Sequence, residues 1–304
     1  MKFTAEHMRQ YCENNPLVSV RKQAPNTTIL KYKNKVFYRN LWTPELCEFR
    51  GTVVDDDWNI VQRPFTKIFN YGEKNAPKIH RNEPVIAVRK VNGFMAAATV
   101  RDKKEFFVST TGSTSSDFVE LAINHLNKQP IIDMLVGLSE ITAIFEIVDP
   151  SDPHVIPENV GAHLLGFRLK DWNAQQHLFS ESHLDELALE SGVHRPEWKA
   201  YSNFQDVKND LRNINHEGFV VRDYNGNELK MKSPYYLVTK FLGRKTQEKL
   251  DQIISNPEEA KKIIDEEFYS VLDYLSTRKD DFINMSEQER FSFVREYFDN
   301  EIIK

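Results

Sequence analysis

Short apolar runs separated by turn residues are the feature that most constrains the fold of this chain. Examples are PVIAVR at 84–89, GFMAAATV at 93–100 and TAIFEIV at 142–148. Runs of this length, bounded by Gly, Pro or Asp, are typical of buried strands, whereas helices and membrane spans need longer patterns. Further strands of the same kind are expected at 105–110, 162–170, 218–222 and 228–232.

Two hairpins and three helices complete the pattern before residue 235. Residues 28–38 (TILKYKNKVFY) place a polar centre between two β-rich arms, and residues 51–62 place an Asp-rich turn between two others. Apolar residues at helical spacing predict a helix at 115–127, and further helices are expected at 180–191 and 204–213. This mixture favours an α+β domain built on antiparallel sheets.

The last part of the chain, from residue 237 onward, has helical patterning instead. Asn256 precedes a proline and two glutamates, and Ser286 stands three residues before Glu289. Both arrangements are typical of helix starts, and the second is a capping box. We therefore predict a small all-helical C-terminal domain over residues 237–304.

Composition narrows the class of protein. Hydrophobic residues make up 40% of the chain and aromatic residues 12%, which is enough for a packed core. No apolar run approaches the length of a membrane span, and the N-terminus lacks the apolar core of a secretory signal. Two cysteines fit a reducing cytoplasm and cannot form a four-ligand zinc site alone. We therefore expect a cytoplasmic protein without a membrane contact.

The net charge of −5 gives no direct sign of a nucleic-acid partner. Net charge describes average solubility and repulsion, however, and it is compatible with a local basic cleft. Basic residues crowd the chain between Arg21 and Arg39, whereas the C-terminal part has acidic runs such as DEE at 265–267. The plain interpretation of both is solvated surface.

A few positions along the chain have the residue types that chemistry needs. Lys90 leaves an apolar run and enters the turn VNG, a pattern that an ordinary hairpin turn also explains. Glu146 lies inside the apolar run FEIV, where a buried carboxylate needs a ligand or, in the plain alternative, a structural ion pair. Glu217 stands directly before another strand. Lys230 and Lys232 are two residues apart, so they share one face of a strand, which is most often a solvated edge.

Taken together, these positions fit a nucleotidyl-transfer site. A lysine amine is a poor nucleophile while it is protonated, and neighbouring ammonium groups disfavour its charged form. Lys230 and Lys232 could therefore activate Lys90 while they neutralise the phosphates of ATP. Glu217 could bind the divalent cation that bridges these phosphates, and Glu146 could accept a hydrogen bond from the ribose.

The same residues resemble the motifs of the covalent nucleotidyltransferases, which include DNA ligases, RNA ligases and capping enzymes. KVNG at 90–93 is similar to their nucleophile motif, while FE at 145–146, EG at 217–218 and KMK at 230–232 are similar to the third, fourth and fifth motifs.

Within this superfamily the chain most resembles the RNA ligase 1 type of bacteriophages. EFRG at 48–51 and RPFTKIFN at 63–70 are similar to the signature of that group before the nucleophile, and the likeness continues with KSPYY at 232–236. The resemblance spans roughly residues 45–240. It departs at Asn92, where an aspartate is common, and at Thr111, near the place where phage members often carry a lysine.

The resemblance implies an ATP-grasp-like nucleotidyltransferase fold for an adenylyltransferase domain over 1–236, followed by the helical domain over 237–304. It implies that Lys90 is the nucleophile, with Lys230 and Lys232 as further catalytic residues, and that Glu217 binds the metal. The implied ATP-binding residues are Arg50, Lys67, Arg89, Gly93, Glu146, Lys230 and Lys232. The implied cofactors are ATP and Mg²⁺, with Mn²⁺ as an alternative.

The activity that this resemblance implies is ATP-dependent joining of RNA ends through a lysyl-AMP intermediate and an RNA-adenylate. The expected partner is RNA with 5′-phosphate and 3′-hydroxyl ends, repair of RNA or tRNA is the implied role, and we expect a monomer. The basic N-terminal hairpin and Lys67 are candidates for contacts with the RNA backbone, which would make binding sensitive to salt.

Two alternatives stay open at this point. A DNA ligase or a capping-type nucleotidyltransferase would share the motifs, although such enzymes usually carry a β-barrel domain where this chain has helical patterning. A catalytically inactive module that binds RNA or nucleotide would share the fold, and the presence of both Lys90 and Glu217 weighs against it.

Overall fold

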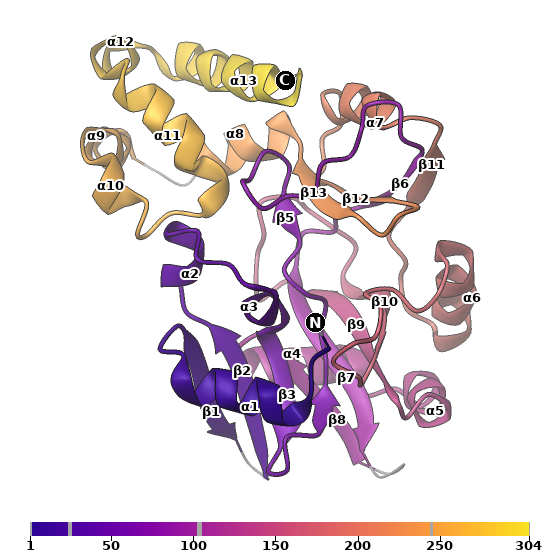
Figure 1. The fold of residues 1–304 in the computed structure, drawn as a ribbon. Helices are drawn as coiled ribbons and strands as arrows, with labels where there is room; N and C mark the ends of the chain where they lie inside the picture. Colours follow the sequence, from indigo (N-terminus) through magenta and orange to yellow (C-terminus); the bar gives the residue numbers. More distant parts are fainter. Residues whose placement is uncertain (1, 24–25, 102–104, 244–245, 304) are drawn as a thin grey trace. The chain divides into compact units, whose positions relative to one another are not determined.

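The computed structural model describes residues 2–23, 26–101, 105–243 and 246–303 (Figure 1). The chain forms two compact units, each built from two separate stretches of sequence. Unit 1 comprises Met1–Lys67 and Val91–Glu197, and unit 2 comprises Ile68–Lys90 and Trp198–Lys304. One of the crossings between the units therefore falls directly after Lys90. The predicted boundary between an adenylyltransferase domain and a helical domain, at residues 236 and 237, stays a prediction.

Unit 1 contains two four-stranded sheets in which neighbouring strands are antiparallel. Their strand orders are β1-β2-β3-β4 and β10-β9-β7-β8. The strands are β1 (Val18–Gln23), β2 (Thr27–Tyr32), β3 (Arg50–Asp55), β4 (Ile60–Gln62), β7 (Phe94–Arg101), β8 (Glu105–Thr110), β9 (Ile141–Val148) and β10 (Gly161–Leu169).

The helices of unit 1 supply the apolar side chains that bury one face of each sheet. They are α1 (Ala5–Asn14), α2 (Lys35–Tyr38), α3 (Pro44–Glu48), α4 (Asp117–Leu126), α5 (Gln129–Gly137) and α6 (Glu181–Ser191). Val119, Leu135 and Leu184, one from each of α4, α5 and α6, share a core with Phe145 on β9. Residues of α1 and α3 pack in the same way with the first sheet. Each helix therefore presents an apolar stripe to a sheet.

The two sheets of unit 1 are joined by a buried polar side chain. Gln62, at the end of β4, is completely buried. Its amide nitrogen donates to the carbonyl oxygens of Ala97 at 3.0 Å and Phe107 at 2.9 Å, and its amide oxygen accepts from the hydroxyl of Ser109 at 2.5 Å. A buried amide is tolerated because its hydrogen-bonding groups are satisfied, so Gln62 fixes β4 against β7 and β8.

A buried ion cluster holds the segment that follows β4. The guanidinium of Arg63 donates to both carboxylate oxygens of Glu48, at 2.9 and 3.1 Å, and Arg168 on β10 lies 3.2 Å from the same carboxylate. Arg63 and Arg168 are each 1% exposed and Glu48 is 6% exposed. A charge this deeply buried is stable only while it is paired, so Glu48 ties α3, β10 and the segment after β4 together.

Unit 2 is built on a five-stranded sheet of order β11-β6-β12-β13-β5. Its strands are β5 (Phe69–Asn70), β6 (Val85–Arg89), β11 (Trp198–Tyr201), β12 (Gly218–Asp223) and β13 (Glu228–Lys232). All neighbours are antiparallel except the short β5, which runs parallel to β13. Helix α7 (Phe204–Leu211) covers one face, where Phe204 and Val207 pack with Ala87 and Val221.

After β13, the regular secondary structure of the described residues up to 303 consists of helices. They are α8 (Pro234–Leu242), α9 (Gln247–Ser255), α10 (Pro257–Ala260), the 3-10 helix η1 (Glu266–Phe268), α11 (Tyr269–Ser276), α12 (Lys279–Asn284) and α13 (Glu287–Ile303). The predicted capping box is confirmed, because the Ser286 amide donates to the Glu289 carboxylate and the Glu289 amide donates to the Ser286 hydroxyl.

A second buried ion cluster joins this helical segment to the sheet of unit 2. Glu267 in η1 accepts from Lys232, the last residue of β13, at 2.5 Å and from Lys240 in α8 at 3.0 Å. Its side chain is only 8% exposed. Burial by itself would raise the pKa of Glu267, but the two ammonium groups outweigh burial and lower that pKa to about 2. Glu267 therefore stays ionised across the neutral pH range.

The sequence predictions agree with most of this fold and fail in one region. The α+β class and the antiparallel sheets are confirmed, as are the strands near 84–89, 105–110 and 228–232. The hairpin predicted over 28–38 is wrong: β2 pairs with β1, and residues 35–38 form the helical turn α2. The turn buries Val36 in the core that α1 and α3 share, which a solvated strand arm could not do.

Two further observations bear on the predictions from composition. None of the helices in the described ranges is long and apolar enough to cross a membrane. Cys12 and Cys47 are both free thiols, and burial raises the pKa of Cys12 to about 12 and that of Cys47 to about 11.

The Glu48 cluster gives a first test of the fold. Glu48→Gln leaves Arg63 and Arg168 buried beside an uncharged amide, so it should destabilise the protein by about 3–5 kcal/mol. The thermal unfolding midpoint should fall by about 10 °C. Glu105→Gln is the control, because Glu105 is half exposed and forms only a surface pair with Arg101. Equal midpoints for the two variants would contradict a structural role of Glu48.

The Glu267 cluster gives a test that depends on pH. The pKa of Glu267 is lowered from 4.5 to about 2, so its contribution to stability is present above about pH 4.5 and is lost as the pH falls toward 2. Glu267→Gln should cost about 3 kcal/mol near neutral pH, and about half of that near pH 3. Thermal midpoints of both proteins at the two pH values measure this. A gap that does not narrow in acid would show that the ion pairs contribute no pH-dependent stability.

Candidate active site

Lys90 directly follows β6, and contacts of its backbone and its side chain hold it beside the start of strand β12. Its backbone amide donates to the carbonyl oxygen of Gly218 at 2.9 Å. Its ammonium nitrogen lies 3.0 Å from Oε2 of Glu217, and the Lys90 side chain is 24% exposed whereas that of Glu217 is 2% exposed. The predicted nucleophile is thus partly accessible, and its ion partner is buried.

Lys232 reaches the same carboxylate from the other side of β12. Gly218 pairs with Lys232 in the register between β12 and β13, and Nζ of Lys232 lies 3.7 Å from Oε1 of Glu217. The two oxygens of Glu217 therefore face two different lysines. Lys90 comes from the β6 side and Lys232 from the β13 side, so the central strand β12 brings together residues that are far apart in sequence.

Ser233, which follows Lys232, fixes this geometry. Its amide donates to the carbonyl oxygen of Glu217 at 2.9 Å, and its hydroxyl donates to the carbonyl oxygen of His216 at 2.6 Å. The same hydroxyl accepts from the amide of Tyr236 at 3.1 Å and so caps helix α8, which has Pro234 in its first turn. The serine in KSPYY thereby ties the metal-ligand candidate, the last lysine and the next helix together.

Gly218 is required by a close approach of backbones. Its φ is +142°, and a Cβ atom there would lie 1.9 Å from the carbonyl oxygen of Met231 and 2.8 Å from Cα of Lys232. No side chain fits this position without separating β12 from β13. Gly218 therefore allows Glu217 and Lys232 to meet.

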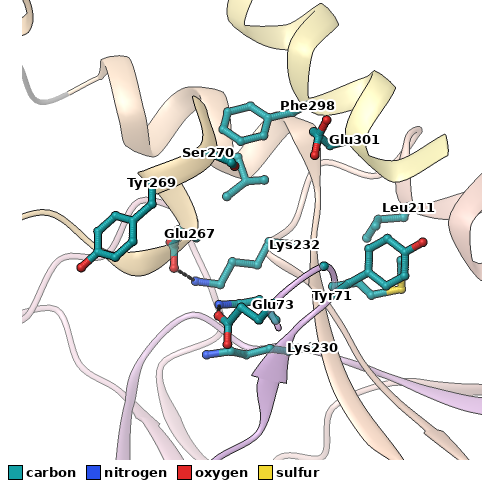
Figure 2. Close-up of a pocket in the computed structure, with 14 residues that line it drawn as sticks. Tyr71, Glu73, Leu211, Lys230, Lys232, Glu267, Tyr269, Ser270, Phe298 and Glu301 are labelled. Carbon is teal, nitrogen blue, oxygen red and sulfur yellow. Dashed lines mark hydrogen bonds and ion pairs between the residues drawn. The ribbon is translucent and has the colours of Figure 1, made fainter. Parts of the chain in front are cut away.

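Lys230 lines a pocket of about 330 Å³ together with Lys232 (Figure 2). The pocket lies wholly in unit 2, and Figure 2 shows both lysine side chains within it, from successive outward positions of β13. The backbone carbonyl of Lys230 accepts from the amide of Tyr71 at 2.8 Å, which places the segment after β5 along one wall. Glu73 and Glu267 also line this pocket, so its lysines are surrounded by acids.

The ion pair of Lys90 differs from the electrostatics expected from the sequence. We expected neighbouring ammonium groups to favour the neutral amine of Lys90. A carboxylate at 3.0 Å has the opposite effect, because it stabilises the ammonium form of a lysine. Nucleophilic attack therefore requires that positive charge from elsewhere engages Glu217.

In unit 1, Gly93 and Glu146 form a second group of predicted residues. The amide of Gly93 donates to Oε1 of Glu146 at 3.1 Å. A Cβ atom at Gly93 would lie 2.2 Å from the carbonyl oxygen of Ile147, so only glycine fits beside β9. Glu146 is 8% exposed. A backbone amide is thus one partner of this buried carboxylate.

Arg50 and Lys67 lie on neighbouring segments of unit 1. The guanidinium of Arg50 donates to the carbonyl oxygen of Thr66 at 3.2 Å, and the amide of Lys67 donates to the carbonyl oxygen of Cys47 at 2.8 Å. The ammonium group of Lys67 lies 5.0 Å from the ring centroid of Trp42, and Lys67 is 8% exposed. A cation–π contact of this kind holds a buried ammonium without neutralising it.

The predicted residues thus fall into two groups. Unit 2 contains Arg89, Lys90, Glu217, Lys230 and Lys232, and unit 1 contains Arg50, Lys67, Gly93 and Glu146. The turn VNG joins the groups covalently, because Lys90 ends a segment of unit 2 and Val91 begins a segment of unit 1.

The structure also explains the two departures from the family pattern. The side-chain oxygen of Asn92 accepts from the backbone amide of Ile156 at 3.1 Å, so an asparagine satisfies this buried position. Thr111 lines a small pocket of unit 1 that Lys31 of β2 also lines. A lysine is therefore present beside Thr111, although a different strand supplies it.

Glu267 and Lys240 are the residues near the predicted lysines that sequence reasoning missed. The acidic run at 265–267 was interpreted as solvated surface, which is wrong for Glu267. The one feature of the sequence that could have indicated burial of Glu267 is the apolar residue next to it, Phe268, which is itself buried. Arg63 and Glu48, which belong to the quoted signature, have a structural role in their buried cluster.

A metal ion bound in the described part of the chain would have few protein ligands. No group of three or more His, Cys, Asp or Glu residues that could hold an ion occurs there. Mg²⁺ usually takes only one or two protein carboxylates together with substrate phosphates and water. The single carboxylate of Glu217 beside Lys90 fits that kind of site.

Known proteins resemble this chain in sequence. The sequence profile of a family described as RNA ligase matches residues 48–241. RNA ligase 1 of bacteriophage TS2126 is 28% identical over 214 residues, which cover 60% of this chain and 50% of that protein. The chain therefore spans about half the length of this curated relative.

Solved structures show the same fold. An archaeal ATP-dependent RNA ligase superposes with a TM-score of 0.59 at 15% identity, covering 98% of this chain and 78% of that one. A putative ATP-dependent DNA ligase from Aquifex aeolicus gives 0.61 at 14% identity, covering 99% and 78%. At these identities the likeness concerns the fold alone, which confirms the predicted class. Since the family profile matches well over half of the chain, this protein belongs to the RNA ligase family.

Proposed function

We propose that this protein is an ATP-dependent RNA ligase that forms lysyl-AMP on Lys90. The observation that carries the proposal is the arrangement at the start of β12, where Lys90 and Lys232 share the buried carboxylate of Glu217. In a member of the RNA ligase family, this supplies a partly exposed amine, a carboxylate for a cation and a lysine for phosphate.

In the first step, Nζ of Lys90 attacks the α-phosphorus of ATP. A phosphorus–nitrogen bond forms, the bond from the α-phosphorus to the bridging oxygen of the β-phosphate breaks, and pyrophosphate leaves. Lys90 must lose a proton before it attacks, so its contact with Glu217 has to weaken. Glu217 can hold a divalent cation, Mg²⁺ or Mn²⁺, which when bound offsets phosphate charge and orients the leaving group.

The other predicted residues bind and orient the nucleotide. Lys230 and Lys232 lie in one pocket and supply positive charge for the phosphates. Glu146, held by the amide of Gly93, accepts a hydrogen bond from the ribose. The remaining nucleotide contacts in this proposal come from Arg50, Lys67 and Arg89. Positioning and charge stabilisation supply most of the rate in phosphoryl transfer of this kind.

Two further steps join RNA ends. The terminal 5′-phosphate of RNA attacks the lysyl-AMP phosphorus, which releases Lys90 and leaves AMP linked to the RNA through a pyrophosphate bond. A 3′-hydroxyl then attacks the RNA phosphorus, the phosphodiester forms and AMP leaves. Repair of broken RNA or tRNA in the cytoplasm is the role that we propose, with the chain acting as a monomer.

Joining of RNA ends is a better candidate reaction than sealing of nicked DNA or capping of a messenger RNA. The described residues from 234 to 303 form helices and connecting turns but no strand, so the stretch after the KMK motif carries no β-barrel there. The family match points the same way. Incubation with 5′-phosphorylated single-stranded RNA and, in parallel, with nicked duplex DNA separates the two functions, since faster sealing of the DNA would overturn the RNA assignment.

The lysyl-AMP step can be tested with labelled ATP. Purified protein with Mg²⁺ should form a labelled band, and Lys90→Ala and Lys90→Arg should lower its formation at least about a thousandfold, because neither side chain can act as the nucleophile. Lys199→Ala is the matched control: Lys199 is an exposed lysine on β11 of the same sheet, and its removal should leave labelling unchanged. A band that persists in Lys90→Ala would exclude Lys90 as the site.

The geometry at Gly218 can be tested independently of the nucleophile. Gly218→Ala should lower lysyl-AMP formation by about a hundredfold or more, because the added Cβ atom pushes β13, and Lys232 with it, away from β12. Gly226→Ala is the control, since Gly226 also has a positive φ, +85°, but a Cβ atom there meets nothing within 4 Å. Comparable labelling by the two variants would show that the close approach at Gly218 is dispensable.

A further inference from the structure

Glu267 is paired with the ammonium group of Lys232, which the proposed mechanism assigns to the phosphates of ATP. Lys232 donates to one carboxylate oxygen of Glu267 at 2.5 Å, and Lys240 donates to the other at 3.0 Å. Figure 2 shows Glu267 reaching Lys232 from the helical segment at the edge of the pocket. Lys232 ends a strand of the sheet, whereas Glu267 comes from residues that follow the KSPYY motif by more than one helix.

The two lysines form a site for an anion with at least two oxygens. Both ammonium groups lie over the ring of Tyr236, at 5.3 Å from its centroid for Lys232 and 5.4 Å for Lys240, so both contact one aromatic ring. A carboxylate bridging two ammonium groups has the same donor–acceptor pattern as a phosphate in that place. Tyr236 is itself buried, and burial raises the pKa of its hydroxyl to about 12, so the ring stays neutral.

The pocket beside this site cannot accept phosphates while its acids stay where they are. Lys232 already faces Glu217 and Glu267, and Glu73 and Glu301 line the same pocket as Lys230. Adding the negative charge of a nucleotide to these carboxylates is unfavourable in a partly desolvated cavity. One carboxylate has to give way, and Glu267 is the one that belongs to the helical segment.

We propose that Glu267 is an internal competitor that occupies Lys232 and Lys240 until the phosphates of the nucleotide displace it, which makes Lys240 a further phosphate-binding residue. The proposal rests on the proposed function, since it takes Lys232 as a phosphate ligand. Asp265, which is more than half exposed, also lies 2.7 Å from Lys240.

Protonation does not release Glu267 near neutral pH. Burial would raise its pKa, but the two lysines hold that pKa at about 2. The carboxylate therefore stays charged, and only a competing anion or a movement of the helical segment frees the lysines. Binding of the nucleotide is then coupled to the position of η1, as two mutually exclusive occupants of one site require.

The test measures binding of inorganic pyrophosphate to the full chain by calorimetry, without ATP or metal. Glu267→Gln should bind pyrophosphate about tenfold more tightly than the wild type, because the competing charge is gone. Glu259→Gln, at an exposed acid of the same segment, should bind like the wild type. If Glu267 only held Lys232 and Lys240 in place for the phosphates, its removal would weaken pyrophosphate binding. Unchanged or weaker binding by Glu267→Gln therefore overturns the proposal.

Two more variants keep the test decisive if Glu267→Gln folds poorly. Glu267→Asp keeps the charge on a shorter side chain that cannot reach both lysines, and it should bind pyrophosphate more tightly than the wild type. Lys240→Met should bind it about tenfold more weakly, and equal binding would exclude Lys240 as a phosphate ligand. Pyrophosphate binding needs no adenylylation, so a wild type that forms no lysyl-AMP refutes the proposed function without deciding this test.

Discussion

The carboxylate of Glu217 is the group on which the rest of the site in unit 2 depends. It is 2% exposed, and a carboxylate so deeply buried needs compensating charge. Lys90 and Lys232 supply it, one at each oxygen. The strand order of the sheet makes this possible, because β12 lies between β6 and β13. Gly218, its first residue, pairs with Lys232 and accepts a hydrogen bond from the amide of Lys90, which follows β6. The sheet therefore gathers three charged residues from separate parts of the chain.

Glu48 and Glu217 are both buried acids, but the cations that pair with them differ in exposure. Glu48 is enclosed by two arginines that are each 1% exposed, so nothing can exchange with it and its role is structural. Glu217 faces Lys90, whose side chain is 24% exposed, and Lys232 is shared with Glu267. Of these two lysines, Lys90 is the one that solvent and a ligand can reach. Access to solvent, rather than burial of the acid, separates the structural cluster from the candidate site.

Sequence patterns predicted the parts of the fold that local chemistry determines. Strands such as 105–110 and 228–232 were identified because alternation and turn residues define them within a few residues. The hairpin over 28–38 failed because Val36 is buried by α1 and α3, which are distant contacts without a local signal. The motifs KVNG, EG and KMK singled out Lys90, Glu217 and Lys232, which the structure brings together. Glu267 was missed for the same reason: its partners Lys240 and Lys232 lie 27 and 35 residues away, so no local pattern indicates the contacts.

The electrostatics of Lys90 follow from the same geometry and differ from what motif order alone suggests. Two lysines near a third would favour its neutral form, yet Glu217 stands between Lys90 and Lys232 and favours the charged form. An ammonium ion cannot attack phosphorus, so the protein with Glu217 bound to Lys90 is a resting arrangement. A cation that binds Glu217 and an anion that binds Lys232 would both weaken the ion pair between Lys90 and Glu217. Activation of the amine and binding of the nucleotide phosphates are then parts of one exchange of ion pairs.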